Sequence, residues 1–117
     1  MKFLLTYQQR PDLPPPTKEK MAAIGEFTVK NIQAGIVKMT GGLVRPTKGI
    51  QLSCEKGKVT VTDGPFAETK ELIDGFALVE VGSREEALRL ATAFMQLAGD
   101  GTGEVLQVFD QADSPPR

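Results

Sequence analysis

The feature that most constrains the fold is a short alternating segment that ends in a forced turn. In residues 58–62, Val59 and Val61 point to one face and the threonines that follow them to the other, which predicts a half-buried strand. Asp63-Gly64-Pro65 then ends the strand, because proline lacks a ladder donor and biases the residue before it away from helix. The chain must therefore change direction at this point.

Length and charge limit the class of protein. The 117 residues suffice for a single domain, expected at residues 1–110, with a flexible tail at 111–117. Fourteen basic and 15 acidic residues nearly cancel and form no long block, which disfavours a direct nucleic-acid partner or an anionic membrane surface. The opening residues are too short for a signal segment, and no apolar run approaches about 18 residues. We expect a cytoplasmic protein.

The chain has no histidine and one cysteine. Histidine is the residue most often used for proton transfer near neutral pH and for binding transition metals. Because the chain has none, we expect no metal and no cofactor. Cys54 cannot form an internal disulfide, which fits a reducing compartment. We expect Cys54 to be a small buried apolar residue and not a nucleophile, because no histidine is present to activate it.

The remaining segments alternate between strand and helix patterns. Further strands are predicted at 2–7, 36–44, 50–54, 75–81 and 104–109, with a flexible link at 100–103. One helix is predicted from Lys18, N-capped by Thr17, to Gly35; a second follows the capping box of Ser83 and Glu86 and ends at Gly99.

Each predicted helix carries a stripe of apolar residues that we expect to face the core. The first stripe contains Met21, Ile24, Phe27 and Ile32, and the second contains Ala87, Leu90, Ala91, Phe94, Met95 and Ala98. Gly25 in the first helix indicates close approach of the helix to the sheet. Gly41-Gly42 within a strand indicates either a bulge or a group that comes near the backbone.

This order of elements predicts an α+β domain with a mainly antiparallel sheet and an inserted hairpin formed by 50–54 and 58–62. Two helices can cover only one face of such a sheet. The strands at 75–81 and 104–109 nevertheless carry apolar side chains toward both faces. We therefore expect a homodimer in which two sheets pack face to face and leave a cleft for a small ligand.

A ten-residue motif adds a resemblance to a known family. The segment Thr62-Asp63-Gly64-Pro65-Phe66-Ala67-Glu68-Thr69-Lys70-Glu71, followed by Gly75-Phe76, resembles the signature of the DGPF-domain branch of the YCII-related family. The likeness extends from the first strand to about Phe109. It implies a ferredoxin-like βαββαβ domain that pairs into a dimeric α/β barrel, in a family whose activity is largely unassigned.

Two kinds of function follow. The first is a metal-independent enzyme of lyase, isomerase or hydrolase type that uses Asp63 as acid or base. Some relatives in this family carry a histidine–aspartate pair, and only the aspartate has a match here; to act as a base near neutral pH, this aspartate would need a pKa raised by burial. The second, which we favour, is a protein that binds a small molecule or serves transcription regulation through protein contacts. Candidate ligand-binding residues are Tyr7, Arg45, Gly64, Pro65, Phe66 and Lys70.

Overall fold

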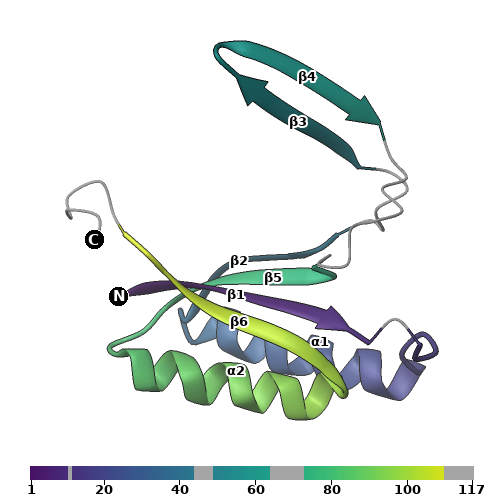
Figure 1. Cartoon of the computed structure of the whole chain (residues 1–117). Helices are drawn as coiled ribbons and strands as arrows, with labels where there is room; N and C mark the ends of the chain where they lie inside the picture. The colour runs from purple at the N-terminus through teal and green to yellow at the C-terminus, as the bar shows by residue number, and fades with distance from the viewer. Residues whose placement is uncertain (11, 44–48, 64–72, 110–117) are drawn as a thin grey trace.

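A computed structural model of the chain describes residues 1–10, 12–43, 49–63 and 73–109 (Figure 1). The elements in chain order are β1 (Lys2–Gln9), α1 (Lys18–Gln33), β2 (Val37–Gly42), β3 (Ile50–Glu55), β4 (Lys58–Asp63), β5 (Gly75–Glu80), α2 (Arg84–Ala98) and β6 (Gly101–Val108). The α+β class predicted from the sequence is confirmed. The predicted tail at 111–117 lies outside the described residues.

The main sheet has four strands in the order β2-β5-β1-β6, and every neighbouring pair is antiparallel. With β3 and β4 set aside, the chain runs β-α-β-β-α-β through this sheet, which is consistent with a ferredoxin-like fold. Figure 1 shows both helices on one side of the sheet. The opposite side, which we call the open face, is covered by neither helix.

The core lies between the sheet and the helices. Phe3 of β1 and Val79 of β5 are opposite each other in register and are the two largest fully buried side chains. Val37 of β2 and Ala87 of α2 complete the buried cluster. Because side chains alternate along a strand, the residues next to Phe3 and Val79, among them Leu4 and Leu78, point to the open face.

Both helix starts follow the predicted capping chemistry. Thr17 Oγ1 accepts a hydrogen bond from the amide of Lys20 at 3.2 Å, and Ser83 Oγ accepts one from the amide of Glu86 at 3.2 Å. Glu86 in turn accepts from the amide of Gly82 at 3.0 Å, one residue before the cap. Gly35 follows the first helix with a φ of +78°, as expected of a terminating glycine.

The stripe predicted for α2 is confirmed, but the stripe predicted for α1 is wrong in part. Met21 and Ile32 are exposed, whereas Ile24 and Phe27 are partly buried. The inward side of α1 continues instead through Asn31, which is buried and donates from Nδ2 to the carbonyl of Phe27 at 2.8 Å. A polar residue can take this position because its amide is satisfied within the helix.

The glycines behave differently from one another. The expectation that Gly25 marks a close approach of α1 to the sheet is wrong, because Gly25 is exposed and a Cβ there would meet nothing within 4 Å. At Gly41 the expectation that another group comes near the backbone is confirmed: a Cβ would lie 3.2 Å from Cε1 of Phe76. The register shift in this strand falls between Val37 and Met39, before the glycines.

The link predicted at 100–103 is also wrong over most of its length, because β6 begins at Gly101. Gly101 and Gly103 pair with Gln9 and Tyr7 of β1. A side chain at either position would collide with a carbonyl oxygen of β1. These glycines therefore allow close pairing and do not mark a loop.

The strands β3 and β4 form a separate two-stranded sheet, which we call the hairpin. Figure 1 shows it apart from the main sheet. All of its strand residues are exposed, from Ile50 to Glu55 and from Lys58 to Asp63. The expectation that Cys54 is buried is therefore wrong: its strand is covered by nothing in the described chain.

Candidate functional site

The open face carries a row of apolar side chains that crosses all four strands of the main sheet. Leu4 of β1 is opposite Leu78 of β5 on one side and Leu106 of β6 on the other, and Leu78 is opposite Met39 of β2. We call these four residues the apolar row. Met39 is 61% exposed and Leu106 is 44% exposed, so the outer strands hold the more accessible part of the row.

Polar residues flank the apolar row along the strands. Lys2 and Glu80 are opposite each other on one side of it, and Thr6 and Glu104 are opposite each other on the other side. Next to Thr6, the ring of Phe76 covers the backbone of Gly41. The open face is thus an apolar band bordered by charged and hydroxyl groups, an arrangement that suits a small molecule with an apolar body.

Tyr7 points to the covered face, at the end of β1. Its ring meets Phe94 of α2 edge to face, with centroids 5.5 Å apart and an interplanar angle of 81°. Its hydroxyl lies 3.3 Å from the carbonyl oxygen of Gly99 and 3.2 Å from that of Asp100. Burial, helped by the negative charges of Asp74 and Asp100, raises the pKa of Tyr7 above its usual value of 10.0. Tyr7 is therefore a neutral donor that ties β1 to the end of α2.

Asp74 joins three strands at the same end of the sheet. Its Oδ2 accepts from the amide of Gln9 at 2.7 Å, its amide donates to the carbonyl of Tyr7 at 2.7 Å, and its carbonyl accepts from the amide of Leu43 at 2.8 Å. Asp74 is not among the site residues predicted from the sequence. Its only signal is an aspartate directly before the strand that begins at Gly75, and its partners are distant in the chain.

A group of charged side chains follows β1 in the chain. Arg10 forms two hydrogen bonds to Asp12, from Nε at 3.0 Å and from a terminal nitrogen at 2.6 Å, and its other terminal nitrogen lies 3.6 Å from Asp100. The hydrogen bonds from Arg10 lower the pKa of Asp12. Arg10 thus bridges the carboxylates of Asp12 and Asp100, while Asp74 is bonded to the backbone of β1.

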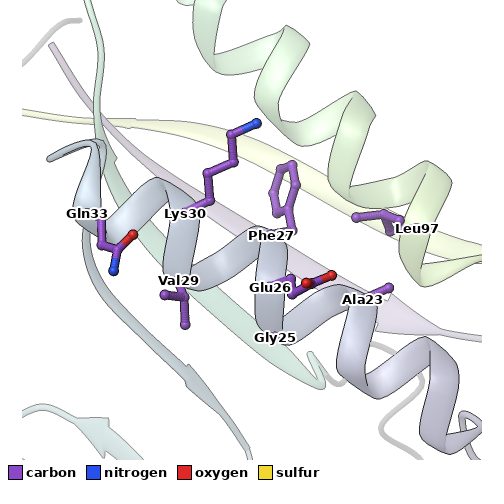
Figure 2. A pocket seen from close by; sticks show the side chains of 8 residues that line it. All are labelled: Ala23, Gly25, Glu26, Phe27, Val29, Lys30, Gln33 and Leu97. Carbon is purple, nitrogen blue, oxygen red and sulfur yellow. The ribbon is translucent and has the colours of Figure 1, made fainter.

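A groove lies along the helix layer, with a volume of about 690 Å³. It is lined by Ala23, Gly25, Glu26, Phe27, Val29, Lys30 and Gln33 of α1 and by Leu97 of α2. Figure 2 shows Leu97 reaching toward Phe27 between the two helices. Most of the lining belongs to one helix and is exposed, and no predicted site residue contributes to it.

The structure does not bring the described site candidates together. Tyr7 lies on the covered face of the main sheet, whereas Asp63 is exposed at the end of β4 in the hairpin, opposite Ile50. The other candidates, Arg45, Gly64, Pro65, Phe66 and Lys70, lie outside the described residues. Within residues 1–10, 12–43, 49–63 and 73–109, no three acidic or cysteine side chains gather in a way that could hold a metal ion. No helix among them is long and apolar enough to cross a membrane.

The fold and the open face together define an α+β domain, consistent with a ferredoxin-like fold, in which neither helix covers one apolar surface of the sheet. The family comparison agrees with this class: the YCII-related domain matches residues 1–111, and the chain belongs to the YCII-related family. An uncharacterized protein of Rhizobium meliloti (strain 1021) is 42% identical over 62 residues, which is 53% of this chain. The chain matches half of that relative's length.

Proposed function

We propose that this chain is a member of the DGPF branch that works as a homodimer and binds a small molecule between the open face and the partner subunit. The apolar row of Leu4, Met39, Leu78 and Leu106 is the observation that carries the proposal. Burying this apolar surface away from water is favourable by about 25 cal/mol for each Å² of apolar area. A second copy supplies a matching surface, because a two-fold interface uses the same patch on both subunits.

The border of the row defines the class of ligand. An apolar body would lie against the leucines, and a polar group would reach Thr6 and Glu104 on one side or Lys2 and Glu80 on the other. Two sheets that face each other in this way, with a ligand between them, form the dimeric barrel expected of the family resemblance. In the chain, Arg45 precedes the hairpin and Phe66 and Lys70 follow it. These three residues remain candidates for the rim of such a cleft.

Binding without turnover is favoured over catalysis for this chain. Its only cysteine and its motif aspartate, Asp63, are both exposed in the hairpin, away from the covered core. An acid–base role for Asp63 would require an environment that removes it from water. The chain by itself does not provide that environment among its described residues.

Titration with the neutral apolar dye Nile red tests the proposal. We expect saturable binding with one affinity class at protein concentrations where the chain is dimeric, and a weaker affinity after dilution to the monomer, because each cleft needs both subunits. The Leu106→Glu variant should lose the tight binding. Equal affinity at all protein concentrations, or no saturation, would contradict the proposal.

A further inference from the structure

The hairpin has one apolar face and one polar face. Leu52 of β3 is opposite Val61 of β4, Cys54 is opposite Val59, and Ile50 is opposite Asp63, so these six side chains share one face. The alternate residues form the other face, which contains Gln51, Ser53, Glu55, Lys58, Thr60 and Thr62. The apolar face is open to water: Leu52 is 66% exposed and Val61 is 61% exposed.

A two-stranded hairpin with this pattern needs a surface to pack against. An isolated hairpin is at best marginally stable in water, and a third strand or a packed apolar face is what makes it persist. The hairpin pairs with no strand of the main sheet, and every residue of both strands is exposed. The described part of the chain therefore contains the hairpin's apolar face but not what covers it.

We propose that the apolar face of each hairpin packs on a second copy of this chain, at the rim of the partner's open face, and closes the ligand cleft there. The inference rests on the homodimer proposed above and adds a part of the molecule that the facing sheets do not use. It also makes each cleft a composite, since the hairpin of one subunit lines the open face of the other.

The areas of the two surfaces support a second copy as the occupant. With strands about 4.8 Å apart and a rise of about 3.3 Å per residue, the open face measures about 19 Å by 23 Å and the hairpin about 10 Å by 20 Å. The flat areas are then about 440 Å² and about 200 Å², against about 800 Å² per partner in a standard interface. Neither surface is sufficient alone, and together they approach that size.

Two-fold symmetry covers both surfaces in one event. The two open faces meet across the two-fold axis, and each hairpin contacts the rim of the partner's open face, so both surfaces of both copies are used. A different protein would have to match both surfaces separately. The chain's near-neutral charge, with 14 basic and 15 acidic residues, opposes no such self-association.

This arrangement gives Asp63 a place in the cleft. Asp63 lies on the same side of β4 as Val59 and Val61, at the end of the apolar face. When that face packs on the partner, the carboxylate reaches the border of the partner's apolar row. A ligand held there would present a hydrogen-bond donor to it.

A matched pair of variants tests the hairpin contact. Leu52→Glu places a charge on the apolar face, and Ser53→Glu places the same charge on the polar face at the next residue. Both side chains are exposed in the subunit, so neither variant disturbs its core. The dimer dissociation constant is measured by sedimentation equilibrium. We expect an increase of about tenfold or more for Leu52→Glu and a change within about twofold for Ser53→Glu.

Cys54 supplies an independent readout, because it is the only cysteine and lies on the apolar face. Its rate of modification by N-ethylmaleimide should be slow in the wild-type dimer, and fast after dilution to the monomer and in Leu52→Glu.

A dimer in which Cys54 reacts fast and the two variants behave alike would overturn the hairpin inference and leave the dimer standing. Protection of Cys54 that does not change with dilution would also overturn it, since the hairpin would then pack on its own chain. A chain that is monomeric at every concentration and whose Cys54 is modified fast would overturn both the proposed dimer and the hairpin contact.

Discussion

The carbonyl oxygen of Thr6 occupies the space that a side chain on Gly103 would need. A Cβ at position 103 would lie 2.6 Å from that oxygen and 3.2 Å from the sulfur of Met95. The backbone of β1 and the helix α2 thus approach β6 from two directions at this residue. The start of β6 depends on a glycine here for lack of space and not for its conformational freedom.

We predict that Gly103→Ala destabilises the fold by about 2–3 kcal/mol, because the group in the way is backbone and cannot move aside without breaking the β1–β6 pairing. Urea unfolding followed by circular dichroism measures this. A change of less than about 0.5 kcal/mol would show that β6 does not pair with β1 at this point.

Gly25→Ala should have the opposite effect. Gly25 lies inside α1, and a Cβ there would meet nothing within 4 Å. The substitution should stabilise the fold by about 0.5–1 kcal/mol, because alanine loses less conformational freedom in a helix. The same urea experiment reports it. A loss of stability would indicate that something packs on this side of α1.

The titration of Tyr7 provides a pH prediction. Burial raises its pKa above 10.0, so the folded state disfavours the phenolate. The stability that Tyr7 contributes should be complete below pH 10 and should decline as the pH rises through the higher folded value. Tyr7 is the only tyrosine, so its ultraviolet absorbance reports this titration directly. The native chain should ionise at higher pH than the urea-unfolded chain; coincident curves would show that the side chain is not held against Phe94.

The apolar row predicts how substitutions on the open face affect self-association. Leu106→Glu should weaken the dimer about tenfold or more, equivalent to about 1.4 kcal/mol, because it places a charge on the apolar row of the proposed interface. Gln107→Glu is the matched control, since the neighbouring residue is exposed and points to the other face. Sedimentation equilibrium compares the two variants. Equal weakening by both would point to net charge and not to the open face.

Asp63→Asn separates a structural role of the motif from a binding role. The substitution keeps a side chain that can form hydrogen bonds in a turn, so melting temperature and dimer mass should stay almost unchanged. Binding of a ligand that donates to the carboxylate should be lost. This is measured by native mass spectrometry of the purified variant with small molecules that co-purify with the wild type. If the variant is unfolded or monomeric, the motif has a structural role and not a binding role.

Local features were predictable from the sequence because their chemistry is local. The caps of Thr17 and Ser83 depend on residues within three positions, and the stripe of α2 on a regular period. The stripe of α1 was not predictable in full, since Met21 and Ile32 fit a helical period and nothing in the sequence reports which side meets the sheet. Asn31 took a buried place through a bond to its own helix.

The site was harder to predict, because its parts meet through pairing between distant strands. Leu4, Leu78 and Leu106 become neighbours only in the register of the sheet. Asp74 acquires its role from Gln9, 65 positions away in the chain. The apolar surface left on two strands did predict an uncovered face, because two helices can cover only one side.

The mass of the wild-type chain in solution shows whether a second copy covers the open face and the hairpin. Sedimentation equilibrium at micromolar concentrations should give about twice the chain's 12.6 kDa, decreasing toward 12.6 kDa on dilution. That result is predicted because neither helix covers the apolar open face, and no described residue covers the apolar face of the hairpin. A mass of 12.6 kDa at every concentration would mean that the chain is a monomer and that neither surface is covered by a second copy.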